Sequence, residues 1–149
     1  MNYSATTFST PVNSLLRASE TVCFQNEAGS IFYNSAGYVR LAWSSDRITL
    51  ESIQAFYEQT LSLLLRTGSQ RILTEHGQRK PLSVAAQQWL TTNWLPRAVQ
   101  EARLSRTAIV EGADPLHRLS TQAVVSAAPA EVVFKRFHTV SSAETWLLE

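Results

Sequence analysis

The second half of this sequence alternates strand-like and helix-like segments, and this alternation limits the fold more than any other feature. Short apolar runs at residues 71–76, 106–111 and 131–137 have the composition of strands, and each is followed by a helical pattern. Strands that are separated by helices pair in parallel through right-handed crossovers. The sequence therefore predicts an α/β fold whose sheet is parallel in this half.

Three more strand candidates precede the first helix, at residues 21–25, 31–34 and 38–43. In the last of these runs apolar residues alternate with others, which is typical of a half-buried strand. Short turns join the three runs, so we expect antiparallel strands at the start of the sheet. The predicted order is β-β-β-α-β-α-β-α-β-α, in a single mixed sheet with helices packed against it.

Four helices are predicted, each preceded by a polar residue that can act as its N-cap: Thr49, Ser83, Asp114, and Ser141 or Ser142. Pro115 follows Asp114 at the first helical position, where its missing N–H is not needed. Gly68 is expected to end the first helix, because glycine readily takes the left-handed conformation found there.

The composition is that of an ordinary globular protein. The chain has 149 residues, and a net charge of +1 from 13 basic and 12 acidic residues. This balance provides no field to attract a phosphate backbone, so we expect no nucleic-acid partner. One cysteine, Cys23, cannot form an internal disulfide or a cysteine-rich metal site.

The N-terminal stretch differs from the rest of the chain. Residues 1–19 are rich in Ser, Thr and Asn and show no clear period, so we expect a flexible arm, followed by a single domain at 20–149. The start of the chain lacks the pattern of a secretory signal, and no apolar run approaches the ~20 residues of a membrane span. These features predict a cytoplasmic protein without a transmembrane segment.

The helix predicted at residues 83–103 contains Trp89 and Trp94, with Pro96 shortly after them. Proline inside a helix removes a backbone donor, so we expect a bend near Thr92. Large aromatic side chains usually pack in the core. The alternative is that Trp89, Trp94 and Pro96 line an apolar groove for a lipid tail, a small apolar ligand or a protein partner.

The segment at residues 87–98, QQWLTTNWLPRA, resembles small bacterial STAS-like domains, also described as SpoIIAA-like or STAS/Sec14-related. In these domains a helix with this tryptophan and proline spacing precedes a strand like residues 106–110. The strand at 38–43 and the terminal segment at 139–148 are also similar, so the resemblance covers about residues 20–149. It implies a small mixed sheet with helices against it, and a role in binding or regulation.

One departure from the wider family concerns a phosphorylated serine. Phospho-switched members carry an Asp-Ser-Ser/Thr-Gly-like motif directly after a central strand. Residues 77–83 contain no such motif. Ser83 is the nearest equivalent by position, and we interpret it as a helix N-cap. The sequence therefore does not favour a kinase-regulated switch.

A second candidate site is the loop before the same helix. Arg79 and Lys80 lie close to Ser83 and could hold an anion near the start of the helix. The loop lacks the spacing of a phosphate-binding loop, so our preferred interpretation is a solvated turn.

Histidines offer little evidence for catalysis. His76, His117 and His138 fall on separate elements without metal-ligand spacing, so we predict no metal and no cofactor. His76 lies at the carboxyl edge of the sheet, where ligands bind in open α/β folds. Its neighbour Glu75 points to the opposite face of the strand, so the two side chains cannot easily serve one pocket.

We therefore expect a non-catalytic, STAS-like module that binds a protein partner or a small apolar ligand. One alternative is a small enzyme that uses His76 together with Glu75 or Arg79. Another is a homodimer formed through the strand at 38–43, which could pair with its twin if it lay uncovered at an edge. The titratable groups look scattered singly along the chain, which favours binding over catalysis.

Overall fold

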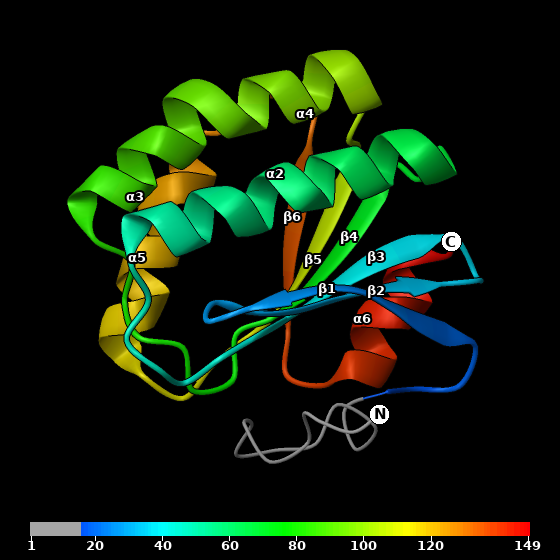
Figure 1. The fold of residues 1–149 in the computed structure, drawn as a ribbon, viewed down its shortest axis with the longest axis horizontal. Helices are drawn as coiled ribbons and strands as arrows, with labels where there is room; N and C mark the ends of the chain where they lie inside the picture. Colours follow the sequence, from blue (N-terminus) through cyan, green and yellow to red (C-terminus); the bar gives the residue numbers. More distant parts are fainter. Residues whose placement is uncertain (1–15) are drawn as a thin grey trace.

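Six strands form one mixed sheet in the computed structural model, which describes residues 16–149 (Figure 1). The strands lie in the sheet in chain order: β1 (Glu20–Asn26), β2 (Gly29–Asn34), β3 (Tyr38–Trp43), β4 (Arg71–Glu75), β5 (Arg106–Val110) and β6 (Val133–Phe137). β1, β2 and β3 pair antiparallel, and β3 to β6 pair in parallel. The predicted mixed sheet is confirmed, whereas most of the predicted N-terminal arm lies outside the described residues.

The helices alternate with the parallel strands as predicted: α2 (Leu50–Thr67), α3 (Val84–Trp89), the π-helical η2 (Leu90–Trp94), α4 (Leu95–Ala102), α5 (Pro115–Ser126) and α6 (Val140–Leu147). Thr49, Ser83 and Asp114 cap their helices by accepting backbone N–H bonds. Gly68 ends α2 in the left-handed conformation, with φ of 74°. No helix among residues 16–149 is both long and apolar enough to cross a membrane.

The predicted start of the last helix is wrong. Thr139 is the N-cap of α6, and its side chain accepts the backbone N–H of Ser142. Ser141 and Ser142 therefore lie inside the first helical turn rather than before it. The reason is that β6 ends at Phe137, which leaves only His138 and Thr139 between strand and helix.

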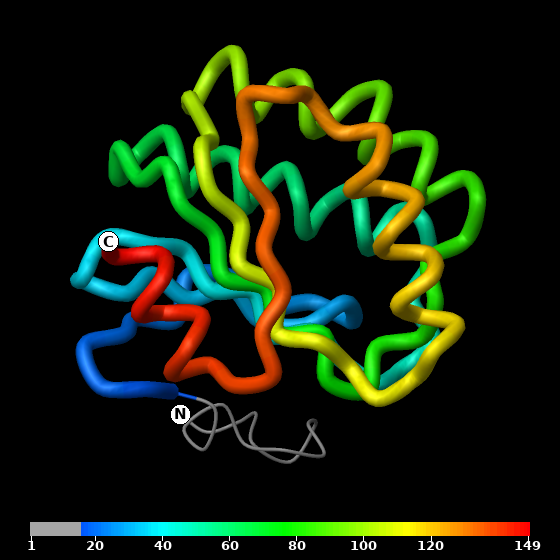
Figure 2. Tube along the Cα trace, turned by 180° about the vertical axis from the view of Figure 1, so that it is seen from behind, coloured from blue at the N-terminus to red at the C-terminus, as the bar shows by residue number. Residues whose placement is uncertain are grey.

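Helices cover both faces of the sheet. Right-handed crossovers between successive neighbouring strands place every connecting helix on the same face, and α2, α3–α4 and α5 all pack there. α6 has no strand after it and folds back over the other face, against β4, β5 and β6. Figure 2 shows these three strands side by side, with α6 in red next to them. Two separate apolar clusters result, a large one under α2, α3–α4 and α5, and a small one under α6.

β3 is buried more completely than its alternating pattern predicts. Leu41 and Trp43 join the large cluster, while Tyr38 joins the small cluster under α6. Arg40 is buried as well and pairs with Glu20 and Glu75. The half-buried prediction is wrong because α6 and this ion-pair network cover the second face of the strand. β3 also lies between β2 and β4, so it offers no free edge for the alternative in which this strand pairs with its twin.

The tryptophan-containing helix runs from α3 through η2 to α4 without a break. The Leu95 N–H donates to the Leu90 carbonyl five residues back, which is the hydrogen bond of a π turn. Pro96 has no N–H, and in a regular α-helix its ring would clash with the Thr92 carbonyl. Near Thr92, where we predicted a bend, the helix has a π turn, which widens the backbone where the proline requires space.

Candidate functional site

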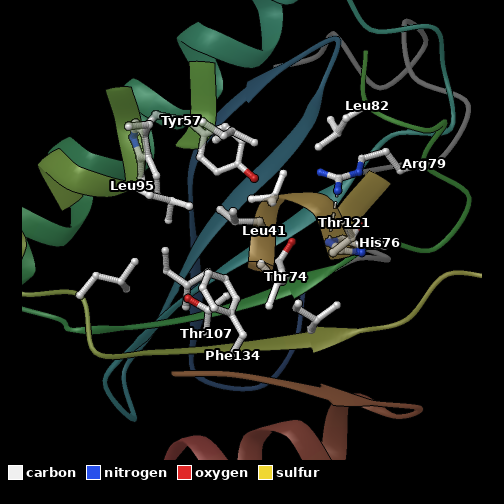
Figure 3. Close-up of a pocket in the computed structure, with 17 residues that line it drawn as sticks. Leu41, Tyr57, Thr74, His76, Arg79, Leu82, Leu95, Thr107, Thr121 and Phe134 are labelled. Atoms are coloured by element: carbon white, nitrogen blue, oxygen red, sulfur yellow. Dashed lines mark hydrogen bonds between the residues drawn. The ribbon is translucent and has the colours of Figure 1, made fainter. Parts of the chain in front are cut away.

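A cavity of about 50 Å³ lies within the large apolar cluster, between the sheet and the helices α2, α3–α4 and α5 (Figure 3). Most side chains that line it are apolar. They come from strands β3 to β6, from η2, α4 and α5, and from the loops before α3 and β5: Leu41, Ile72, Leu82, Leu90, Trp94, Leu95, Leu104, Ile109, Val124, Val125 and Phe134. The polar lining residues are Tyr57, Thr74, His76, Arg79, Thr107 and Thr121. The cavity therefore has an apolar body with a few polar groups.

Three of the polar groups in this region form a buried cluster at the carboxyl edge of the sheet. His76 directly follows β4, and the Arg79 N–H donates to the His76 carbonyl in the turn after it (2.8 Å). His117 lies in the first turn of α5. Arg79 Nε donates to His117 Nε2 at 2.7 Å, its Nη2 lies 3.3 Å from His76 Nε2, and the two imidazole rings are 4.6 Å apart. We call these three residues the Arg79 cluster.

Arg79 is a buried cation without a carboxylate partner. Its side chain is enclosed, with the residue only 3% exposed, and its guanidinium stacks 4.2 Å from the Trp43 ring. Among the described residues no Asp or Glu forms an ion pair with it. Burial lowers the pKa of Arg79, and the nearby Tyr57 hydroxyl opposes this effect. A buried charge of this kind is destabilising unless something compensates it.

Arg40, in β3, is a second buried arginine, and its charge is balanced by carboxylates. It is as buried as Arg79 but pairs with the carboxylates of Glu20 (2.8 Å) and Glu75. Burial lowers its pKa, but the two carboxylates outweigh burial and raise the pKa of Arg40 above its ordinary value. Arg40 lies in β3 and pairs on the face of the sheet away from the cavity, whereas Arg79 lies in the loop after β4 and stacks on Trp43, so the Arg40 carboxylates do not pair with Arg79.

The two histidines of the Arg79 cluster are neutral. Burial, with the charge of Arg79 next in importance, lowers the pKa of His76 well below its ordinary value and the pKa of His117 to about 4. Because each Nε2 faces an arginine N–H, it serves as the acceptor and the ring proton belongs on Nδ1. Each imidazole therefore has an Nδ1–H donor without a partner, on the side of the ring away from Arg79.

Several polar atoms around the cavity have no hydrogen-bond partner. They are Arg79 Nη1, His76 Nδ1, Thr107 Oγ1 and Thr121 Oγ1 on lining residues, and His117 Nδ1 beside them. Buried polar atoms are nearly always satisfied in folded proteins. In Figure 3 the Arg79 guanidinium and the Tyr57 hydroxyl both point toward the cavity. The unsatisfied atoms mark this cavity as a place where a ligand could complete the hydrogen bonding.

The structure separates the residues of the predicted apolar groove. Trp94 lines the cavity, is 1% exposed and donates its Nε1–H to the Tyr57 carbonyl (2.6 Å). Trp89 and Pro96 are half-buried and do not line it; Trp89 packs against the Tyr57 ring at 6.3 Å. The cavity lies under the helix, on the side of Trp94 that faces the sheet.

The residues of the predicted anion site do not lie together: one is buried and two are exposed. Lys80 and Ser83 are exposed, and Ser83 is occupied as the N-cap of α3. Arg79 points inward instead, so the solvated turn that we preferred is wrong for this residue. It is wrong because the turn bond between Arg79 and His76 directs the arginine under the helices rather than toward solvent.

Sequence reasoning also missed the clustering itself. His76 and His117 lie on separate elements, as predicted. Parallel pairing of β4 and β5 places the carboxyl ends of these two strands side by side, and the segments that follow them carry the two histidines. Glu75 points to the other face and pairs with Arg40, which confirms that it and His76 do not share a pocket. Tyr57 and the lining threonines were not predicted, because single polar residues within apolar elements carry no distinctive pattern.

No protein-family model matches the chain, and no curated protein is significantly similar to it. The candidate site therefore has to be interpreted from its own geometry.

Proposed function

We propose that this protein is a non-catalytic binding module, of the STAS-like type that its tryptophan helix resembles, and that its interior cavity holds a small, mainly apolar molecule. The observation that carries this proposal is the cavity itself: about 50 Å³ of space lined by mostly buried side chains, in a protein interior that normally leaves few voids. Apolar pockets with a few convergent polar groups are the usual form of small-molecule sites.

The size of the cavity limits the ligand. It has room for roughly three to five water molecules, and hence for a ligand of roughly four to six non-hydrogen atoms. A ligand this small gains little free energy in total, so we expect a dissociation constant between roughly millimolar and micromolar.

The polar groups favour binding over catalysis. Both histidines direct Nε2 to Arg79, and their lowered pKa values leave them neutral at pH 7. A neutral imidazole whose acceptor nitrogen is occupied is a poor general base. The alternative of a small enzyme rests on His76 and Arg79 in one cavity, and turnover of a bound ligand would support it instead.

A titration monitored by NMR tests the proposed site. Butanol and butyramide, added in the millimolar range, should shift the amide signals of cavity-lining residues. Thr121→Leu fills the cavity from α5 and removes an unsatisfied hydroxyl, so it should abolish these shifts. Ala123→Leu adds an exposed side chain to the same helix and should leave them unchanged. Shifts confined to the surface, or equal in both variants, would contradict the proposal.

A further inference from the structure

We propose that the ligand of this cavity carries a carboxylate group, which Arg79 binds, and that the apolar body of the cavity holds a short aliphatic chain. The ligand class is then a small monocarboxylate. This inference rests on the proposed function, because it assigns the chemistry of the same cavity.

The charge of Arg79 favours an anionic ligand. Arg79 is buried, and the described residues supply no carboxylate to it. Residues 1–15 contain neither Asp nor Glu, so no side chain from that segment can supply one either. The Trp43 ring and the Tyr57 hydroxyl are neighbours of Arg79 within the chain, and a carboxylate from outside the chain would supply the counter-charge. Arginine is well suited to this role, because its planar fork binds both oxygens of a carboxylate.

The unsatisfied polar groups around the cavity can all donate hydrogen bonds. Arg79 Nη1 can only donate, and His76 Nδ1 also donates, because His76 Nε2 faces the guanidinium. The hydroxyls of Thr107 and Thr121 can donate as well. An ionised carboxylate offers about four acceptor sites and no donor. It complements this set, whereas an amide or an amine would place its own donors against donors.

The rest of the cavity is apolar and suits a hydrocarbon chain. Beyond the Arg79 cluster the walls are formed mainly by leucine, isoleucine and valine side chains and by Trp94 and Phe134. Such walls suit methylene groups and give no partner to a second charged group. This selects a monocarboxylate with a short hydrocarbon chain over inorganic phosphate or a dicarboxylate.

The surface outside the cavity is suited to the entry of an anion. A hollow of about 580 Å³ shares the lining residues Arg79 and Leu82 with the cavity, so the two spaces lie next to each other. Its rim carries the exposed cations Arg47 and Lys80. Positive charge at an entrance raises the local concentration of an anionic ligand.

Butyrate and butyramide provide the test, because they have the same number of non-hydrogen atoms and differ mainly in charge. Titrations of the full chain at pH 7, followed by the amide signals of the cavity, should give butyrate an affinity about ten- to hundredfold higher. Equal affinities, or tighter binding of butyramide, would overturn the inference while leaving the proposed function intact. If neither compound shifts cavity signals, the proposed function fails as well.

Variants assign the selectivity to Arg79. Arg79→Met should lose the preference for butyrate but still bind butyramide, and Arg79→Lys should recover part of the preference because it restores the charge. Arg118→Met removes an exposed cation of α5 beside His117, and it should keep the preference at its wild-type value. A preference that survives in Arg79→Met would overturn the assignment. If that variant does not fold, the butyrate and butyramide titrations of the wild type still decide the ligand class.

Discussion

Single residues show that the same side chain has different consequences on the two faces of this sheet. Arg40 and Arg79 are equally buried, yet the carboxylates around Arg40 raise its pKa while burial lowers the pKa of Arg79. An arginine with both charge partners in the chain contributes to the fold. An arginine whose partner is missing is kept at the expense of stability, which is a frequent property of binding sites.

His117 provides a pH test at this scale. The unfolded chain protonates this histidine as the pH falls through about 6.5, whereas its lowered pKa keeps the folded form neutral until about 4. The unfolded state thus binds more protons in this range, so the stability is complete above pH 6.5 and declines toward pH 4. We expect His117 to account for a loss on the order of 2 kcal/mol between pH 7 and pH 5.

Denaturant unfolding at the two pH values measures this loss. His117→Gln keeps an acceptor for Arg79 but cannot titrate, so its stability should change less between pH 7 and pH 5 than that of the wild type. Leu116→Gln is the matched control, since Leu116 is the exposed neighbour of His117 on α5 and has no titratable group, so the pH dependence should stay as it is. Equal pH dependence in wild type and His117→Gln would show that this histidine does not titrate as described.

At the scale of elements, the loops after β4 and β5 hold the Arg79 cluster in place. The His76 N–H donates to the Val110 carbonyl (3.1 Å), which fixes the end of β4 against β5. Gly112 then approaches Gly77 so closely that a Cβ on Gly112 would lie 2.5 Å from the Gly77 carbonyl oxygen. The position of the loop from Gly77 to Arg79 therefore depends on a glycine in the next loop.

Gly112→Ala should disturb this contact. Because the new methyl group meets backbone rather than a flexible side chain, we expect a loss of unfolding free energy of roughly 1–3 kcal/mol. The Gly77 loop must also shift, so butyrate binding should weaken. Gly68→Ala is a suitable comparison: it strains the left-handed end of α2 but meets no neighbouring atom, so it should lower stability without affecting the cavity. Unchanged butyrate affinity in Gly112→Ala would argue against the loop contact.

At the scale of the whole molecule, the sheet separates the cavity from the apolar cluster under α6. α2, α3–α4 and α5 enclose the cavity on the larger side, while the small cluster under α6 contains Tyr38, Leu73, Ala108, Ala143 and Leu147. The Tyr38 hydroxyl also donates to Glu144 at 2.7 Å, which fixes α6 to β3. Stability and binding are therefore expected to be separable by face.

Leu147→Ala tests this separation. Leu147 is fully buried under α6, and its truncation should lower the unfolding free energy by roughly 2–5 kcal/mol. The affinity for butyrate should stay within error of the wild-type value, because the sheet lies between Leu147 and the cavity. Calorimetric unfolding and the NMR titration give the two quantities. A matching loss of affinity would mean that the two faces are coupled.

Local patterns in the sequence determined the order of the elements, the mixed sheet and most helix ends, since hydrophobic period and capping preferences act over a few residues. Thr49, Gly68, Ser83 and Asp114 were predicted in this way and take these positions. Only the tertiary structure decided that Arg79 turns inward to meet His76 and His117. That contact depends on strand pairing and on which charge is left without a partner, and neither is encoded in the residues beside Arg79.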